Sequence, residues 1–323
     1  MALNNLNFFS QIKKFNYFEK NANIAVGVSG GVDSITLVYL MSKWAKINNY
    51  NIVALIVDHR LRPNSSKEAR NVSLYLSNLK INNKILIWKN KKYKTRIQEN
   101  ARLARLKIIQ KYCYQNNIIH LFLGHHLDDS LETFVLRKVA GSDIEGLNSI
   151  KFISINEKIF IIRPLINFSR NEIMDYAKKN RLYWVEDPSN TKIFFSRTKI
   201  RSAISKNEKI KNDIKRELDI FQNIHKDYIE MINYILCKTI IFISDKYIEI
   251  DKNLFFQLPK EIAHKVLVIS VIYLQKGNIR FKHSKLMAIY SDLAKKNGYF
   301  QTQKTIFTNT FNSILISKAK DFD

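Results

Sequence analysis

A short polar loop with two glycines is the part of the sequence best suited to bind phosphate. Ser29-Gly30-Gly31-Val32-Asp33-Ser34 follows an apolar run, 23–28, and opens a helical pattern. Adjacent glycines allow a tight turn, and the N-terminus of a helix directs N–H groups and its positive dipole end at an anion. The two serine hydroxyls can add hydrogen bonds, and Asp33 can help to hold Mg²⁺ against phosphates. A bare Gly-Gly pair is typical of an ordinary strand–helix turn, but the whole string favours a phosphate site.

A second polar cluster follows the apolar run 118–125. It contains two adjacent histidines and three carboxylates, namely His125, His126, Asp128, Asp129 and Glu132. Asp129 and Glu132 fall one helical turn apart and therefore on one face of a helix. A structural zinc site would need cysteines or a closed set of ligands. Carboxylates suit Mg²⁺ or an incoming amine better, so Asp128 and Asp33 are the candidate Mg²⁺ ligands.

Five continuous apolar runs predict the strands that position these loops. The runs are 23–28, 51–59, 84–89, 118–125 and 158–165, and helical patterns lie between them at 34–47, 65–79, 98–117 and 129–141. Continuous apolar runs are typical of buried parallel strands, and a spacing of about 30 residues is that of a βαβ unit. The predicted fold class is therefore α/β, a doubly wound, mostly parallel, Rossmann-like sheet. Such sheets bind ligands beyond the carboxyl ends of their strands.

The pattern changes after residue 205. A long, charged, amphipathic helical stretch begins there, and short strands are expected only near 247–250 and 313–319. We therefore predict a catalytic domain over residues 1–205 and a smaller, mainly helical domain over 206–323.

The charge balance indicates a polyanionic partner. The chain carries 53 Lys+Arg against 28 Asp+Glu, a net charge of +25 with a pI near 9.8. An AT-rich coding bias could explain the abundance of lysine, but it does not explain the basic run at 84–111, whose only acidic residue is Glu99. Lys91, Lys92, Lys94 and Arg102 are the candidate RNA contacts in this run. A solvated face remains the alternative interpretation.

The cysteines and the hydropathy exclude other classes of protein. Cys113 and Cys237 lie in separate segments, so no zinc or disulfide framework is available, and both are interpreted as small core residues. No stretch approaches the ~18 apolar residues of a membrane helix. We expect a cytoplasmic protein with no membrane partner.

Six strings, the glycine loop among them, carry a resemblance to a known family. The string SGGVDS resembles the pyrophosphate loop of the N-type ATP pyrophosphatases, the PP-loop superfamily, which split ATP between the α and β phosphates. The other strings are similar to those of the tRNA(Ile)-lysidine synthetases, also called tRNA(Ile)-lysidine synthases. They are Val57-Asp58-His59-Arg60-Leu61-Arg62, Gln98-Glu99-Asn100-Ala101-Arg102, the run 124–133, Arg163-Pro164-Leu165, and the run 184–190 with Arg197 and Arg201 after it. The chain departs from the family at Thr198, where an asparagine is common.

The resemblance implies an enzyme that adenylates the wobble cytidine of tRNA(Ile) with a CAU anticodon and couples free L-lysine to its carbon 2. ATP would be the co-substrate, with Mg²⁺, and AMP and pyrophosphate would leave. The implied catalytic residues are Asp33, Asp129, Glu132 and Arg201; ATP would contact Ser29 to Ser34, Asp58 and His59; lysine would contact Asp129, Glu132 and Arg197. Domain 206–323 is expected to bind tRNA. The oligomeric state stays open, and a homodimer is one option.

Two other functions are compatible with parts of this pattern. A tRNA 2-thiolase of the same superfamily would activate the same kind of oxygen and then deliver sulfur, which usually needs catalytic or cluster-binding thiols. Neither cysteine lies near a motif, and no C-x-x-C occurs. A non-catalytic nucleotide-binding or RNA-binding module would gain little from Asp33, Asp128, Asp129 and Glu132 beside a polyanion. Both alternatives are therefore disfavoured.

Overall fold

The computed structural model describes most of the chain, in two compact units. The described residues are 2–15, 18–60, 64–88, 97–148, 150–156, 158–185, 200–204, 207–276, 281–295, 298–302 and 304–319, without the side chains of 97–102 and 283. Lys91, Lys92, Lys94, Arg197 and Thr198 lie outside the described residues, as does the side chain of Arg102. Unit 1 comprises residues 1–221 and unit 2 residues 222–323. Each is described by itself.

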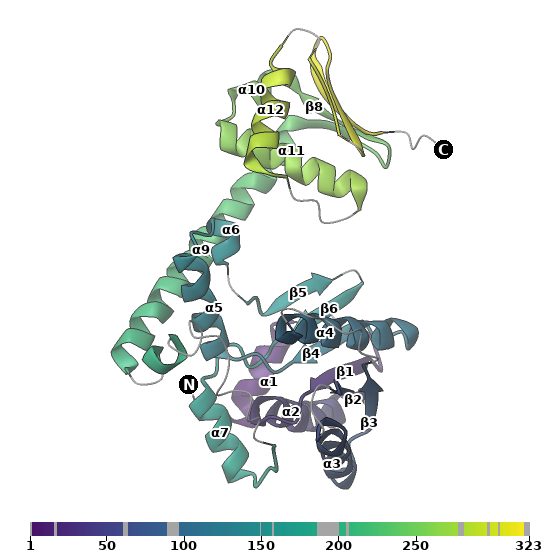
Figure 1. The fold of residues 1–323 in the computed structure, drawn as a ribbon, viewed down its shortest axis with the longest axis vertical. Coiled ribbons are helices and arrows are strands. Elements are labelled where there is room, and N and C mark those ends of the chain that lie inside the picture. The colour runs from purple at the N-terminus through teal and green to yellow at the C-terminus, as the bar shows by residue number, and fades with distance from the viewer. Residues whose placement is uncertain are drawn as a thin grey trace. The chain divides into compact units, whose positions relative to one another are not determined.

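Unit 1 contains a six-stranded sheet in the order β3-β2-β1-β4-β6-β5 (Figure 1). The strands are β1 (Asn23–Val28), β2 (Asn51–Asp58), β3 (Asn83–Ile87), β4 (His120–Leu123), β5 (Ile153–Asn156) and β6 (Ile159–Ile162). All neighbours pair in parallel except β5, which runs antiparallel to β6. The predicted α/β fold class and its five strands are confirmed. Strand β5, a short edge strand, was not expected.

Helices cover both faces of this sheet. The helices of unit 1 include α1 (Asn5–Lys13), α2 (Val32–Asn48), α3 (Ser65–Asn78), α4 (Ile97–Gln115), α5 (Leu127–Val139), α6 (Ile144–Leu147), α7 (Arg170–Lys179) and the first part of α9 (Glu208–Thr239). In Figure 1, α2 and α3 lie on one face and α4 on the other. Strand β1 serves both layers, because Ile24 and Val26 join the core under α2 while Ala25 joins the core under α4. This alternation explains why the strand is apolar at nearly every position.

The strand order creates a switch point beside β1. From β1 the chain passes to β2 and β3 on one side and then returns to β4 on the other side. The connections that leave β1 and β4 therefore run toward opposite edges of the sheet. A crevice is expected between them, beyond the carboxyl ends of these two strands. The glycine loop follows β1, and the histidine–carboxylate cluster follows β4.

Unit 2 combines helices with an antiparallel sheet. Its strands are β7 (Ile240–Ile243), β8 (Tyr247–Asp251), β9 (Tyr299–Gln301), β10 (Thr305–Asn309) and β11 (Ser313–Lys318), in the order β7-β8-β11-β10-β9. Its helices are the remainder of α9, α10 (Lys252–Gln257), α11 (Lys260–Gln275) and α12 (His283–Leu293). The two strands expected near 247–250 and 313–319 are β8 and β11. The sheet around them was not expected, although helices still make up more of the unit.

The first part of α9 belongs to unit 1. Leu218 and Phe221 pack with Leu131 and Phe134 of α5 in one apolar cluster. The contacts of unit 1 extend to residue 221, and the domain boundary at residue 205 stays a prediction. No helix in the described part of the chain is long and apolar enough to cross a membrane.

Candidate active site

The glycine loop has the geometry of an anion cradle. Gly30 has a φ of +89°, which only glycine adopts without strain, and Gly31 is the N-cap of α2 without a side-chain cap. Ser34 Oγ accepts a hydrogen bond from the Ser29 N–H at 3.1 Å and donates to the Gly31 carbonyl at 2.9 Å. These bonds close the loop on itself. The N–H groups of the first turn of α2 have no acceptor within the helix and can serve a phosphate.

The end of β4 approaches this loop closely. A Cβ on Gly124 would lie 3.2 Å from the carbonyl carbon and oxygen of Asp33 and from the Ser34 nitrogen. A side chain there would press on backbone atoms, so the glycine lets β4 come against the first turn of α2. The segment 183–185 approaches from another direction, since the Val185 N–H donates to the Gly30 carbonyl at 2.9 Å. Three segments distant in sequence thus meet at the loop.

His126 stands at the centre of the acidic cluster. Its Nε2 lies 3.8 Å from Asp33 Oδ2 and 3.5 Å from Asp129 Oδ2, and its Nδ1 lies 3.6 Å from Asp128 Oδ2. The imidazole is nearly buried, at 5% exposure. Three of the carboxylates expected to act in the site therefore surround one histidine. The structure brings together the loop after β1 and the loop after β4, as the strand order requires.

The carboxylates around His126 differ in their pKa values. Burial raises the pKa of Asp33, and the nearby Asp129 adds to this, although His126 partly offsets it. Burial also acts to raise the pKa of Asp129, but His126, His125 and the His126 backbone N–H outweigh it and leave that pKa below its usual range. Asp129 is therefore a carboxylate at neutral pH, suited to bind a cation, while Asp33 is the group whose charge is destabilised without one.

Glu132 and Arg201 form a two-point ion pair. Arg201 Nε donates to Glu132 Oε1 at 2.6 Å and its Nη2 donates to Oε2 at 3.1 Å. Glu132 is almost buried, at 6% side-chain exposure, whereas Arg201 is 37% exposed. The hydrogen bond to Glu132 is the main cause of a raised pKa at Arg201. Two predicted site residues thus bind each other, and Glu132 fixes where the guanidinium of Arg201 points.

Asp58 holds a turn. Its carboxylate accepts hydrogen bonds from Ser65 Oγ at 2.9 Å, Ser66 Oγ at 2.6 Å and the Arg60 N–H at 3.1 Å. Burial raises the pKa of Asp58, but these bonds outweigh it and leave the pKa below its usual range. Its contact with ATP stays a prediction, as does that of His59, which follows β2 and is half-buried.

Asp128 is contacted by two residues that were not predicted from the sequence, Arg170 and Lys211. The Arg170 N–H donates to Asp128 Oδ2 at 2.7 Å, and Lys211 Nζ lies 3.1 Å from Asp128 Oδ1. Both of its carboxylate oxygens are therefore engaged. Arg170 follows Ser169, the N-cap of α7, so the capping box there was a usable signal. Lys211 sits among many helix lysines and had no distinguishing signal.

The arrangement favours Asp33 over Asp128 as a ligand of Mg²⁺. Asp33 Oδ1 is buried without a hydrogen-bond partner, an arrangement that a bound cation would satisfy. Among the described residues, no group of three or more His, Cys, Asp or Glu side chains is placed to hold a metal ion by itself. One carboxylate with substrate phosphates is a common way to bind Mg²⁺. Asp33 fits that requirement.

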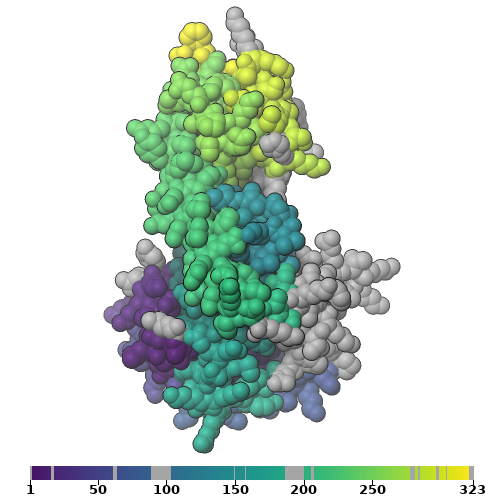
Figure 2. Space-filling model, turned by 90° about the vertical axis from the view of Figure 1, so that its left-hand side faces the viewer, coloured from purple at the N-terminus to yellow at the C-terminus, as the bar shows by residue number. Residues whose placement is uncertain are grey.

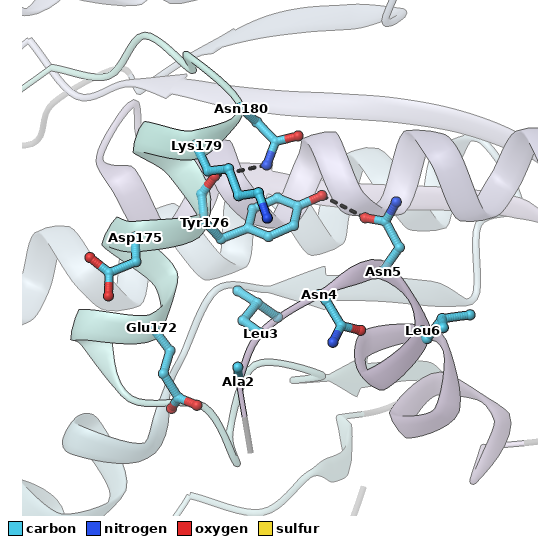
Figure 3. A pocket seen from close by; sticks show the side chains of 10 residues that line it. All are labelled: Ala2, Leu3, Asn4, Asn5, Leu6, Glu172, Asp175, Tyr176, Lys179 and Asn180. Atoms are coloured by element: carbon cyan, nitrogen blue, oxygen red, sulfur yellow. Dashed lines mark hydrogen bonds between the residues drawn. The ribbon is translucent and has the colours of Figure 1, made fainter.

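A separate open pocket lies between the N-terminal segment and α7. It has a volume of about 540 Å³, and Leu3, Asn5, Glu172 and Tyr176 are among its lining residues. Figure 3 shows Tyr176 reaching across to Asn5, to which its hydroxyl donates at 2.6 Å. Burial raises the pKa of Tyr176 to about 12. None of the predicted site residues lines this pocket.

The two cysteines lie in different units. Cys113 is buried in the core under α4, and burial raises the pKa of its thiol to about 12. Cys237 is exposed on α9 in unit 2, so its interpretation as a core residue is wrong.

Comparison with known proteins agrees with this geometry. Residues 4–208 match the PP-loop domain. A U34-tRNA thiolase from Methanococcus maripaludis, solved with its 4Fe-4S cluster, shares the fold with a TM-score of 0.59 at 18% identity, over 68% of this chain and 78% of that one. The fold and the loop thus define a PP-loop protein.

Relatives with higher sequence identity show which family of PP-loop proteins the chain belongs to. The tRNA(Ile)-lysidine synthase of Wolbachia pipientis wMel is 38% identical over 285 residues, which cover 86% of this chain and 66% of that protein. That of Orientia tsutsugamushi is 30% identical over 329 residues, 96% of this chain and 73% of that protein. The chain belongs to the tRNA(Ile)-lysidine synthase family. It spans about two thirds of the length of the Wolbachia relative.

Proposed function

We propose that the chain ligates free L-lysine to carbon 2 of the wobble cytidine in tRNA(Ile) with a CAU anticodon. ATP is consumed to AMP and pyrophosphate, and the product, lysidine, changes decoding from AUG to AUA. One observation carries the proposal. Asp33 of the glycine loop and Asp129 of α5 each place a carboxylate oxygen within 3.8 Å of Nε2 of His126. The reaction has two steps. The first, the adenylation of cytidine, needs an anion cradle for the phosphates of ATP. The second, the attack of lysine, needs a carboxylate that can bind an amine.

The first half-reaction turns a poor leaving group into a good one. The carbon-2 oxygen of cytidine attacks the α-phosphorus of ATP, and pyrophosphate departs. The N–H groups at the start of α2, with the Ser29 hydroxyl, hold the phosphates that become pyrophosphate. Asp33 would hold Mg²⁺, which would neutralise charge on these phosphates. Without adenylation the oxygen would have to leave as hydroxide.

The second half-reaction forms the new carbon–nitrogen bond. The ε-amine of lysine attacks carbon 2, and AMP leaves with the former carbonyl oxygen. Lysine arrives as an ammonium ion, and Asp129, ionised and 26% exposed on its side chain, binds that cation and accepts its proton. Glu132 supports this arrangement through Arg201, whose guanidinium meets the lysine carboxylate or the phosphate of the adenylate. Arg197 is a second candidate for the lysine carboxylate.

The remaining partners follow from the family and from charge. The net charge of +25 favours a polyanion, and Lys91, Lys92, Lys94 and Arg102 are the proposed tRNA contacts of unit 1. Unit 2 is proposed to bind another part of the tRNA. A cytoplasmic location fits a tRNA substrate, and a homodimer stays one option for the assembled state.

Incorporation of labelled lysine tests the proposal. Purified protein is incubated with ATP, labelled lysine and a tRNA(Ile) transcript with a CAU anticodon, and pyrophosphate is measured in parallel. We expect label in tRNA and pyrophosphate in equal amounts. Pyrophosphate without label, or neither product from folded protein with intact tRNA, contradicts the proposal.

The cysteines separate lysine transfer from sulfur transfer. The fold is shared with a thiolase, so this alternative needs its own test. We expect the Cys113→Ala, Cys237→Ala variant to keep its lysine incorporation, with a stability loss of about 1 kcal/mol from the small cavity at Cys113. Loss of activity in a folded variant, with sulfur in the product, would favour the thiolase.

A further inference from the structure

The first turn of α9 places one lysine against the acidic cluster. Lys211 Nζ lies 3.1 Å from Asp128 Oδ1, and the two side chains are only 12% and 17% exposed. The other oxygen of Asp128 accepts the Arg170 N–H at 2.7 Å and lies 3.6 Å from His126 Nδ1. Breaking a sheltered ion pair by removing one partner leaves a poorly solvated charge. Asp128 is therefore fixed between the start of α7, the start of α9 and the ring of His126.

Lys211 belongs to a longer seam between α9 and α5. The two helices pack through Leu131, Phe134 and Leu218, and α5 lies beside the first part of α9 in Figures 1 and 2. A second ion pair, between Lys138 of α5 and Glu217 of α9, ties the same helices further along. That pair is far more exposed, at 51% and 38%, and Lys138 lies near the opposite end of α5 from the cluster. The seam thus offers two lysine–carboxylate pairs, of which one touches the candidate site.

The charges around His126 explain why this lysine matters. Asp33, Asp128 and Asp129 each place an oxygen within 3.8 Å of the same imidazole. Carboxylates this close repel one another, and a nearby opposite charge relieves the repulsion. Lys211 neutralises Asp128, which leaves Asp129 as the carboxylate available to a substrate cation. Without Lys211, Asp128 would turn toward His126 or bind the substrate ammonium in the wrong place.

We propose that Lys211 is a positioning residue for the lysine-transfer step. By neutralising and orienting Asp128, it holds His126 and Asp129 in the geometry that receives the substrate amine. This inference rests on the proposed function, because it assigns the affected step to lysine. It places a determinant of lysine recognition on α9, outside the strings that carry the family resemblance.

Steady-state kinetics of lysine incorporation test the inference, with Lys211→Met as the main variant and Lys138→Met as its matched control. We expect Lys211→Met to lower kcat/KM for lysine roughly 10-fold to 100-fold, because a displaced reacting group costs this much. The KM for lysine should rise while the KM for ATP stays within about twofold. A merely structural role would lower the active fraction and leave both KM values unchanged. Lys138→Met should match the wild type, and Lys211→Arg should recover most of the loss.

A double-mutant cycle shows whether Lys211 acts through Asp128. If it does, Lys211→Met combined with Asp128→Asn is no worse than Asp128→Asn alone. The double variant carries no uncompensated charge, so it decides the question if Lys211→Met alone does not fold. Additive losses, or a Lys211→Met enzyme that behaves like Lys138→Met, would overturn the inference. A wild-type protein that incorporates no lysine would instead overturn the proposed function, so the two failures are distinguishable.

Discussion

Two buried histidines flank the same strand, and they have different surroundings. His120 begins β4 with 0% exposure, and His126 follows its end with 5%. His120 Nε2 lies 2.6 Å from one carboxylate, Glu19, and its ring is enclosed by Phe15, Phe18 and Phe160. His126 has three carboxylates within 3.8 Å and the glycine loop beside it. Burial of a histidine therefore does not mark a site; its place relative to the switch point does.

The two ends of β4 also differ in what they contribute to stability. At His120 the aromatic contacts bury apolar surface, and a single ion pair completes the packing. At His126 like charges are held together, an arrangement that costs stability and is typical of functional sites. We expect substitutions at the His126 end to change activity and those at the His120 end to change stability.

The largest effect is expected at Asp33. Asp33→Asn keeps the shape of the side chain but removes the charge beside the phosphate loop, and pyrophosphate release should fall roughly 100-fold to 1000-fold. Asp175→Asn, an exposed site on α7, is the matched control and should keep the wild-type rate. Wild-type release from a folded Asp33→Asn protein would remove Asp33 from the mechanism.

A more selective effect is expected at Asp129. Asp129→Asn should raise the KM for lysine roughly 10-fold to 100-fold, since a charge-assisted contact to the ammonium is lost. Pyrophosphate release from ATP and tRNA without lysine serves as the internal control and should persist. If both steps fail equally in the folded variant, Asp129 does not act on lysine in particular.

A moderate effect on tRNA affinity is expected from the basic run. Changing Lys91, Lys92 and Lys94 to Gln should weaken binding and lower the salt slope by up to about 2 to 3, because each phosphate contact contributes about 0.7 to 0.9. Lys13, Lys178 and Lys179 are exposed and give a charge-matched control. The salt dependence of tRNA binding is measured by filter binding. If it has the same slope in both triple variants, the tRNA contacts lie elsewhere on the protein.

The smallest effect is expected at Glu19. Burial acts to raise its pKa, but the hydrogen bond with His120 outweighs it and lowers the pKa below its usual range. The pair therefore stabilises the fold above the ordinary pKa of about 4.3, and this contribution is lost as the pH falls through the folded value. Glu19→Gln should lower the free energy of unfolding by less than about 1 kcal/mol at neutral pH, since Glu19 is half exposed. Denaturant titrations at neutral and acidic pH should show this gap closing in acid, with unchanged activity. A gap that is constant with pH would mean that the stabilisation does not depend on the charge of Glu19.

The sequence was sufficient to predict the strands that are covered on both faces of the sheet. Strand β1, predicted over 23–28, has those bounds in the structure, because both of its faces are covered and its apolar run is continuous. Strands β5, β7 and β9 have only three or four residues each and lie at sheet edges, and the apolar residues of β7 directly follow the helical pattern of α9. Short edge strands depend on their neighbours for hydrogen bonds and are weakly encoded locally.

The sequence named several residues that the structure brings together, but it did not predict how they pair. The motifs identified Asp33, Asp129 and Glu132, and strand order brought the first two to one histidine. The pairing of Glu132 with Arg201 spans 69 residues, and it depends on how the segment around 200–204 packs on α5. Charge and spacing alone could not select that partner among many basic residues.

The nucleoside composition of the tRNA product tests the central claim most directly. A tRNA(Ile) transcript with a CAU anticodon is incubated with the protein, ATP and lysine, digested to nucleosides and analysed by mass spectrometry. The account predicts lysidine at the wobble position, formed only when both ATP and lysine are present. Unchanged cytidine from active, folded protein, or a thiolated nucleoside when a sulfur donor is supplied, would contradict it.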